Sequence, residues 1–497
     1  MERSKVIFGN EISAKDYKKG IRNQKKFLRK FGDDRNTEYK LTLVDNPVIS
    51  GPLGVKTIVI DHEGKDKPFE EQLKELPGKP IIIGNIRMGF GHYRISMAMA
   101  SAAHSLGYTP LWFDLNSFPE TTCTKIISAQ NDLYSLGSRL SQKSKLFNKL
   151  VWEPTNYTGF KKLSYNSSDQ KVSEAMVAIY KQIPKDVPLI GTHVWPAQVA
   201  LHAGMTKVVN AIPDNWPMAL HLAEGALHTV QTWNTYFGYR TLNGFVDGKV
   251  LNPMSENDIM YTGQYIDDEL VKNIEKDCKA RIDRVKNGKP VRFLITVGGA
   301  GAQGEFFAQI VKTLLPYVKQ NRACIYLNCG DYINVLDKLV ADTGISDIVK
   351  KHVDDWDDAS SVAMAGAGEK SNYSAEEAGS GIHAFCNKNI FAAVYLTNLL
   401  MRASDVIVTK PSELAYYPIP KLFIKRIGGH EMWGAIHSAD MGDGTQECDT
   451  VDFACSTAKS FIEEPFILTK MCECIMTNNK NGIYNGAYEV VKAAIAR

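Results

Sequence analysis

Residues 291–304 read VRFLITVGGAGAQG, and this stretch decides the fold class that the sequence predicts. The apolar run 291–297 indicates a buried strand. The glycines of 298–304 predict a tight loop, and residues 305–318 predict a helix that starts at this loop. A further strand is expected at 323–328. A strand, glycine loop, helix and strand in this order are typical of a parallel sheet with right-handed crossovers.

The same order occurs earlier in the chain. Residues 79–92 read KPIIIGNIRMGFGH, which predicts a strand that delivers a second glycine loop to a helix at 93–106. A strand at 108–114 follows. Short apolar runs predict more strands at 187–191, 207–212, 228–231, 405–409 and 421–424. The predicted fold class is therefore α/β, with two Rossmann-like domains that face each other across a cleft.

Changes in composition divide the chain into four predicted regions. A basic extension, residues 1–78, packs on or flanks the first domain. The first Rossmann-like domain occupies 79–285, and the second occupies 286–460. Helices at 461–497 follow and are expected to cross back to the first domain.

Composition narrows the class of protein. The 497 residues carry a net charge of +3, which disfavours nucleic-acid binding by bulk charge. No apolar run is long enough for a membrane-spanning helix. The nine cysteines are scattered, and residues 1–40 contain no apolar signal core. These features predict reduced thiols and a cytoplasmic location.

The N-terminal segment is more basic than the chain as a whole. Residues 1–40 contain twelve Lys or Arg and six Asp or Glu, and a basic amphipathic helix is expected between Asp16 and Phe31. Such a helix binds an anionic membrane surface, which would make the protein peripheral on a membrane. The alternative is a solvated helix that packs against the main body. Both interpretations stay open at this point.

The loop 298–304 indicates an anion site. Backbone N–H groups at a helix N-terminus favour phosphate or diphosphate. Gly299, Gly301 and Gly304 also fit the dinucleotide fingerprint. However, Asp331 stands about ten positions later than the acidic residue of that fingerprint. A phosphate site is thus favoured over a nicotinamide or flavin site, and close helix–sheet packing is the structural alternative.

Several short motifs occur in a characteristic order. They are Gly89-Phe90-Gly91-His92, Gly191-Thr192-His193-Val194-Trp195-Pro196, Ile212-Pro213-Asp214, Tyr261-Thr262-Gly263-Gln264-Tyr265, Gly298-Gly299-Ala300-Gly301, Ile382-His383-Ala384-Phe385, Met401 to Lys410, and Gly429-His430-Glu431. By these motifs, residues 81–435 resemble GT-B glycosyltransferases. The resemblance is to the branch of the monogalactosyldiacylglycerol synthases and the peptidoglycan N-acetylglucosaminyltransferases.

The resemblance implies a role for each matched residue. His92 is the candidate base, and Asp214 either shares that role or orients the acceptor, whose side also includes Gly89, Gly91 and His193. The donor would be held by Gly298, Gly299, Ala300, Gly301, Ala302, Phe385, Lys410, Ser412, Glu413, His430 and Glu431. Within this set the loop amides would hold the phosphates, the backbone near Phe385 the base, and Glu413 the ribose. His430 and Glu431 stand at the family's Gly-Gln-Glu motif, and Glu431 would contact the hydroxyls of the donor sugar.

The resemblance also implies the reaction. The donor would be a UDP-linked sugar, which is a substrate, and no cofactor is expected. The acceptor would be a lipid or another hydroxyl compound, and transfer would invert the sugar without a metal. Asp354 to Asp358 contains Asp-X-Asp, but we interpret this acidic run as a solvated face. The sequence predicts neither the sugar nor the oligomeric state.

Two departures from the family keep alternatives open. The loop between Lys410 and Glu413 is shorter than the family's donor loop, and Phe90 stands where glycine is usual. One alternative is an epimerase or hydrolase that acts on a nucleotide sugar in the same fold. The other is a non-catalytic protein that binds a nucleotide sugar.

Overall fold

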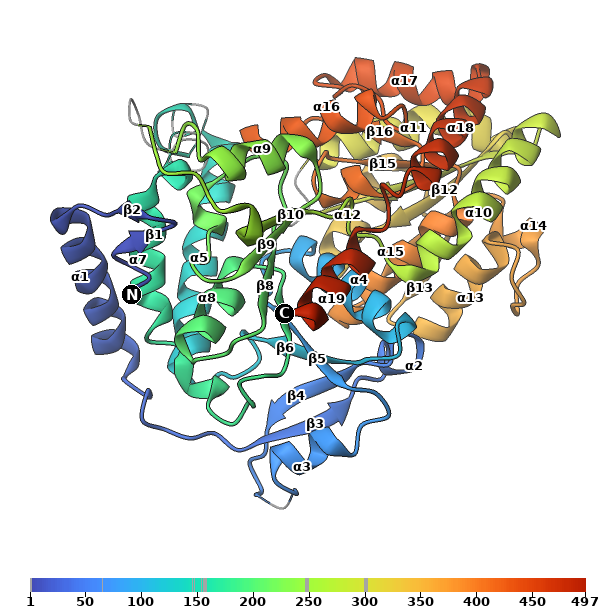
Figure 1. Cartoon of the computed structure of the whole chain (residues 1–497). Coiled ribbons are helices and arrows are strands. Elements are labelled where there is room, and N and C mark those ends of the chain that lie inside the picture. The colour runs from blue at the N-terminus through green and yellow to red at the C-terminus, as the bar shows by residue number, and fades with distance from the viewer. Residues whose placement is uncertain are drawn as a thin grey trace. The chain divides into compact units, whose positions relative to one another are not determined.

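The computed structural model describes residues 2–64, 66–144, 146, 148–152, 154, 159–245, 250–298 and 303–497. The chain forms two compact units (Figure 1). Unit 1 contains Met1–Asp267, Gly428–His430 and Asn485–Arg497. Unit 2 contains Asp268–Ile427 and Glu431–Tyr484. Each unit is built around its own sheet.

The sheet of unit 1 has eight strands in the order β10-β9-β8-β7-β5-β6-β4-β3. Every pair is parallel except β3 with β4, which is antiparallel. The strands are β3 (Leu41–Asp45), β4 (Lys56–Ile60), β5 (Pro80–Asn85), β6 (Thr109–Asp114), β7 (Leu189–Gly191), β8 (Val208–Ala211), β9 (Leu227–Val230) and β10 (Ile259–Tyr261). The fold class predicted from the sequence, α/β with parallel sheets in two halves, is confirmed.

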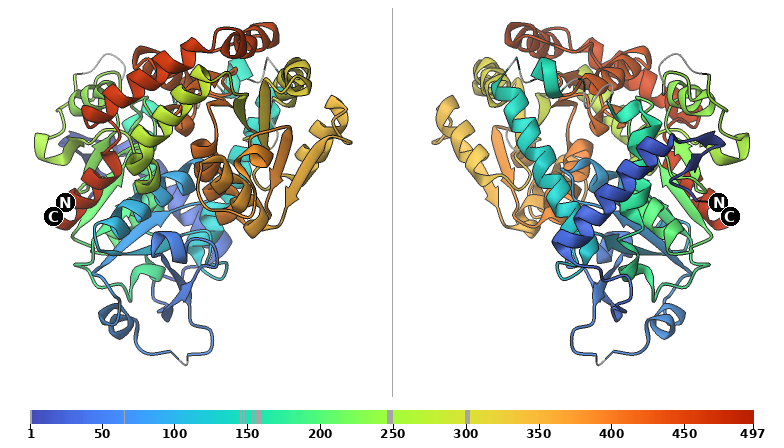
Figure 2. Two further views of the ribbon diagram at one scale, coloured as in Figure 1. Left: turned by 90° about the vertical axis from the view of Figure 1, so that its right-hand side faces the viewer. Right: turned by 90° about the vertical axis from the view of Figure 1, so that its left-hand side faces the viewer.

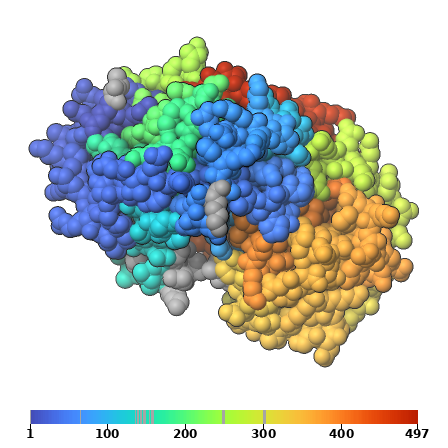
Figure 3. Space-filling view, turned by 90° about the horizontal axis from the view of Figure 1, so that it is seen from below, coloured from blue at the N-terminus to red at the C-terminus, as the bar shows by residue number. Residues whose placement is uncertain are grey.

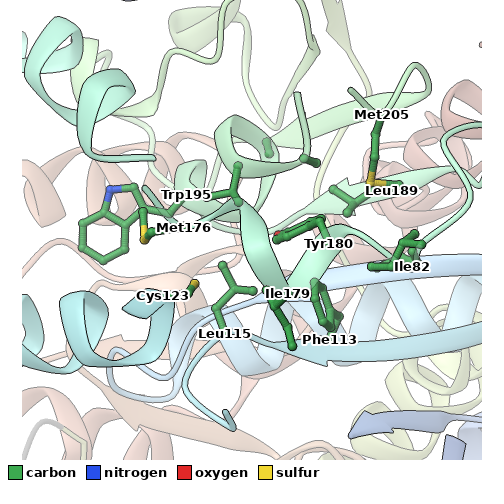
Figure 4. Packing of buried hydrophobic residues seen from close by; sticks show 14 of the residues in the cluster. Ile82, Phe113, Leu115, Cys123, Met176, Ile179, Tyr180, Leu189, Trp195 and Met205 are labelled. Atoms are coloured by element: carbon green, nitrogen blue, oxygen red, sulfur yellow. The ribbon is translucent and has the colours of Figure 1, made fainter. Parts of the chain in front are cut away.

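Helices accompany the sheet of unit 1, and a short hairpin of β1 (Val6–Ile7) and β2 (Asn10–Glu11) precedes them. The helices are α1 (Ala14–Phe31), α2 (Ser50–Leu53), α3 (Phe69–Lys74), α4 (Gly91–Ser105), α5 (Thr122–Lys143), α7 (Leu163–Ser173), α8 (Val194–His202), α9 (Trp233–Thr241) and α19 (Gly486–Ala496). Figure 4 shows how the core packs, with Ile82, Phe113 and Tyr180 close together. The rings of Phe113 and Tyr180 meet edge to face at 4.9 Å.

The strand order creates a switch point in unit 1. From β5 the chain crosses to β6 on one side, and β7 lies on the other side of β5. Loops at the carboxyl ends of such neighbouring strands diverge, which leaves room for a ligand there. The loop after β5 and the turn after β7 both lie at this edge. They contain His92 and His193.

Unit 2 has a six-stranded sheet, parallel throughout, in the order β13-β14-β12-β11-β15-β16. Its strands are β11 (Val291–Thr296), β12 (Ala323–Asn328), β13 (Val349–Val353), β14 (Ile382–Cys386), β15 (Val406–Thr409) and β16 (Lys421–Phe423). Here the switch point lies between β11 and β15. The predicted phosphate loop follows β11, and Lys410 follows β15.

The helices of unit 2 connect these strands and continue beyond the sheet. They are α10 (Asp268–Lys286), α11 (Gly304–Lys319), α12 (Ile333–Thr343), α13 (Trp356–Gly366), α14 (Ala375–Ala378), α15 (Ile390–Ala403), α16 (Met432–Asp440), α17 (Val451–Glu463) and α18 (Phe466–Lys480). In the described part of the chain, no helix has the length and apolar character needed to cross a membrane.

Residues 354–380 are more ordered than their polar composition indicates. Helix α13 begins after Asp355, whose carboxylate accepts a bond from the N–H of Asp358. Ala359, Val362 and Ala363 are buried, and α13 packs against α15. The interpretation of this acidic run as a solvated face is therefore wrong for Asp358, which bonds to His352 and Tyr373.

Candidate active site

His92 lies in the first turn of α4, at the switch point of unit 1. Gly89, with φ of 73°, turns the chain before the helix, and this left-handed conformation favours glycine. His92 Nδ1 is 2.8 Å from the carbonyl oxygen of Thr192. Because a carbonyl oxygen only accepts, Nδ1 carries a proton, and in the neutral ring Nε2 therefore carries the lone pair. The ring is half-buried, and its orientation is fixed by this bond.

A second contact holds the same loop. The hydroxyl of Ser96 donates to the carbonyl of His92 at 2.8 Å, and its oxygen lies 2.7 Å from Oγ1 of Thr192. Both hydroxyl groups are fully buried. The first turn of α4 is thus tied to the end of β7, which positions His92 against the following turn.

His193 begins α8 as its N-cap residue. Its Nδ1 accepts the N–H of Trp195 at 3.2 Å, so the proton of the neutral ring is on Nε2. Burial, reinforced by His92 and His221, lowers the pKa of His193 well below its usual range. The ring is therefore neutral at physiological pH. Its contact with His92 is edge to face, with ring centroids 4.9 Å apart.

Small residues allow α8 to start this close to the sheet. A Cβ on Gly84 would lie 2.8 Å from Pro196, and one on Gly191 would lie 3.0 Å from Ala197. Both distances are too short for ordinary packing. Glycine at the ends of β5 and β7 therefore places His193 at the sheet edge.

Asp214 lies in the loop after β8, and its side chain is 35% exposed. Its Oδ2 lies 3.5 Å from Nε2 of His221. Burial lowers the pKa of His221 to about 4, so this ring is neutral near pH 7. Nδ1 of His221 is 3.0 Å from the hydroxyl of Tyr239. The Asp214 carboxylate thus faces a neutral imidazole, and part of it remains accessible to solvent.

Asp169 is a buried carboxyl group next to this cluster. Its Oδ2 accepts the indole N–H of Trp195 at 3.3 Å, and the Trp195 ring meets that of His193 edge to face at 4.7 Å. Burial raises the pKa of Asp169 to about 7. The histidine cluster consequently has a carboxyl group behind it that titrates near neutral pH.

Most of the predicted phosphate loop in unit 2, Gly299, Ala300, Gly301 and Ala302, lies outside the described residues. Gly298 is described and follows β11, with open space around the position of a Cβ. At the other end, Gln303 has φ of 67° and precedes α11. Its side-chain amide donates to the carbonyl of Lys425. The loop therefore connects β11 to the N-terminus of α11, as the sequence indicates.

Lys410 follows β15 and forms an ion pair with Glu431. The second carboxylate oxygen of Glu431 accepts the N–H of Ile427 at 2.8 Å. Ser412 and Glu413 are half-buried beside Pro411, and Glu413 begins a short 3-10 turn. The structure thus places Lys410, Ser412 and Glu413 at the end of one strand. It occupies both oxygens of Glu431 with protein partners.

Phe385 and His430 lie apart from the other predicted donor-side residues. The Phe385 side chain is fully buried in β14, where its ring stacks on that of His352 at 4.8 Å. Only its backbone remains for the predicted contact with a base. His430 belongs to unit 1, whereas Glu431 belongs to unit 2.

Sequence reasoning missed His221, Tyr239 and Asp169. His221 stands in the stretch 217–228 with no motif around it, and Asp169 lies inside a helix. No spacing in the sequence connects these residues with His92. Among the described residues no cluster of His, Cys, Asp and Glu has a geometry for a metal ion.

Two family models each match about half of the chain. Residues 6–241 match the family model "Domain of unknown function (DUF6937)". Residues 254–495 match a second model, "Domain of unknown function (DUF6938)". Comparison with curated protein sequences gave no match.

Solved structures with a distant similarity include an epimerase, a synthase and a glycosyltransferase. UDP-GlcNAc 2-epimerase from Neisseria meningitidis, bound to UDP-GlcNAc, is 12% identical, with a TM-score of 0.42, over 84% of this chain and 97% of the epimerase. The trehalose 6-phosphate synthase of Burkholderia multivorans is 11% identical, with a TM-score of 0.42, over 84% and 98% of the two chains. A glycosyltransferase from Rickettsia africae is 11% identical, with a TM-score of 0.35, over 83% and 96%.

Proposed function

We propose that the chain is a glycosyltransferase that moves a sugar from a UDP-linked donor to a hydroxyl acceptor with inversion. The observation that carries the proposal is the bond from His92 to the carbonyl of Thr192, at the switch point of the unit 1 sheet. This bond fixes the tautomer that a general base requires. The order of the family motifs along residues 81–435 supports the same reading.

The proposed step is a direct displacement. Nε2 of His92 takes the proton of the acceptor hydroxyl while the hydroxyl oxygen forms a bond to C1 of the donor sugar. The bond between C1 and the diphosphate oxygen breaks, and UDP leaves with the electron pair. His92 ends the step as an imidazolium. The Asp214 carboxylate is accessible enough to orient the acceptor, while the neutral His221 leaves its negative charge uncompensated.

The donor side is assigned to unit 2. Backbone N–H groups of residues 298–302 would hold the diphosphate, since a loop at a helix N-terminus favours an anion. Glu413 would accept from the ribose hydroxyls. Because Glu431 pairs with Lys410, we assign Glu431 to positioning that lysine rather than to direct contact with the sugar. The acceptor is a lipid or another alcohol.

The test measures UDP release from a panel of UDP-sugars, with and without lipid acceptors that carry a free hydroxyl. The proposal predicts UDP release that depends on an acceptor, with the sugar recovered on that acceptor. Release of UDP without an acceptor would identify a hydrolase instead. Binding of UDP without turnover for any donor and acceptor would identify a binding protein.

A further inference from the structure

Helix α1 presents a row of cations that have no acidic partner. Its 18 residues include eight Lys or Arg and a single acid, Asp16. All eight are exposed, and none forms an ion pair within the described chain: Lys15, Lys18, Lys19, Arg22, Lys25, Lys26, Arg29 and Lys30. Helix α10 differs, because Lys272 pairs with Asp268 and Lys279 with Glu275. Within the described residues, no acidic side chain therefore pairs with the cations of α1.

The opposite face of α1 is occupied by the body of unit 1. Gln24 donates to the carbonyl of Lys171 at 2.6 Å, and Asn23 donates to the hydroxyl of Ser168 at 2.8 Å. A Cβ on Gly20 would lie 3.2 Å from Cα of Ser168, so α1 lies very close to α7. The helix is fixed to unit 1 with its cations outward, and it does not need to detach to bind an anionic partner. Figure 3 shows N-terminal residues, in blue, at the surface.

The first turns of α1 also border a hollow. Its volume is about 560 Å³, and it is lined by Ala14, Lys15, Lys18, Ile21 and Arg22. Three cations thus surround a partly apolar surface. This combination suits an anionic group attached to an apolar one.

Helix α5 presents exposed leucines on the same unit. Leu133, Leu136 and Leu140 lie on one helix face and are 71%, 49% and 42% exposed. Leu146 and Leu150, which follow in the chain, are also exposed. Clustered apolar side chains of this size on a protein surface mark a contact site. Single exposed leucines need no explanation, but a stripe on one helix does.

The two features lie on neighbouring helices of unit 1, α1 and α5. The end of α1 and the start of α5 are joined, because Thr122 donates its hydroxyl to the carbonyl of Gly32 and its N–H to Asp34. The right-hand view of Figure 2 shows α1, in blue, and α5, in teal, both toward the viewer and closest to each other at their lower ends. A partner that meets this face would encounter both the cations and the leucines.

We propose that this face, made of the α1 cations and the α5 leucines, docks on the surface of an anionic lipid bilayer. Lipid phosphates neutralise the cations, while the acyl region accepts the leucines. A nucleic acid would neutralise the cations but would leave the leucines exposed to water. The proposal does not depend on the proposed enzymatic activity, since docking requires neither a nucleotide nor an acceptor.

The test is co-sedimentation of the full-length protein with vesicles. One set contains phosphatidylcholine alone and the other contains phosphatidylcholine with phosphatidylglycerol. We expect binding to the anionic vesicles only, and weaker binding as NaCl screens the charges. Each cation near such a surface contributes roughly a fivefold factor, so the triple variant Lys15→Gln, Lys18→Gln, Arg22→Gln should bind about 100-fold more weakly.

Two further variants separate this face from bulk charge. The triple variant Lys272→Gln, Lys276→Gln, Lys279→Gln removes the same charge from α10 and should bind vesicles like the wild type. Leu133→Ser with Leu136→Ser and Leu140→Ser should weaken the binding that remains at high salt. Equal losses in the α1 and α10 variants would overturn the proposal. So would a wild type that binds single-stranded DNA but no anionic vesicles.

Discussion

The rings of His92 and His193 meet edge to face, with centroids 4.9 Å apart and planes at 90°. The two residues follow different strands, β5 and β7, and they meet because these strands are neighbours in the parallel sheet. They differ in role. Nδ1 of His193 accepts the N–H of Trp195 at the start of α8. Nδ1 of His92 instead donates to the carbonyl of Thr192, which leaves the lone pair of the neutral ring on Nε2.

Replacement of His92 tests the role of the base. We expect His92→Ala to lower kcat by roughly a hundredfold or more, because a positioned base typically contributes 10² to 10⁴ in rate. The affinity for UDP should stay unchanged, since His92 is assigned to the acceptor side. The measurement pairs initial rates with calorimetric titration of UDP. A variant with wild-type kcat would remove His92 from the mechanism.

His193 should matter for stability rather than for the chemical step. Loss of an N-cap costs about 1 kcal/mol, and the buried cavity left by His193→Ala adds to this. His193→Asn retains a capping acceptor and should therefore lose less stability than the alanine variant. Urea unfolding of both variants provides the measurement. Equal stability of the two variants would argue against the capping role.

The raised pKa of Asp169 predicts that the stability of the folded protein falls as the pH rises. Its pKa in the folded protein is about 7, above the ordinary value of 3.8, so the folded state holds this proton more tightly. The resulting stabilisation is present below pH 4 and is lost as the pH rises through 7. Asp169→Asn removes this loss and should raise the free energy of unfolding at pH 8, by up to about 4 kcal/mol.

Urea titrations of wild type and Asp169→Asn at pH 4 and pH 8 measure this effect. The gain of the variant should appear at pH 8 and be absent at pH 4. The comparison between the two proteins cancels other titrating groups. A variant that is less stable than the wild type at pH 8 would mean that the ionised carboxylate is required there.

Glu413 tests the donor side separately. A hydrogen bond to a charged acceptor contributes about 1.5 to 3 kcal/mol, so Glu413→Ala should weaken UDP binding by roughly 10- to 100-fold. Deoxy-UDP without the ribose 2′-hydroxyl should show a smaller difference between variant and wild type. The exposed Glu464→Ala serves as the matched control. Identical affinities of the Glu413 and Glu464 variants for UDP would contradict the ribose assignment.

Much of the fold could be predicted because the buried strands are short apolar runs next to glycine loops. The strands at 79–84, 108–114 and 291–297 agree with β5, β6 and β11. Strands β3 and β4 were not predicted because they are short, only partly buried and lie inside a charged segment. Helix α13 was not predicted because its buried face consists mainly of small residues such as Ala359 and Ala363, which give a weak apolar pattern.

The candidate site could be predicted only where residues stand beside a strand end. His92, His193 and Asp214 each follow a strand of the unit 1 sheet, so motif and topology point to the same edge. His221 and Asp169 join this cluster through packing between distant segments, which leaves no periodic signal in the sequence. For Phe385, the sequence motif was found at the expected position, but the motif could not show that the ring is buried in the core.

The most direct test of the central claim is thermal unfolding of the purified protein with UDP, with a panel of UDP-sugars and with nicotinamide dinucleotides. A ligand at 100 times its Kd stabilises the folded state by about 2.7 kcal/mol, which is enough to raise Tm by a few degrees. We expect a higher Tm with UDP and with at least one UDP-sugar, and an unchanged Tm with the dinucleotides. A folded protein whose Tm responds to no nucleotide would contradict it.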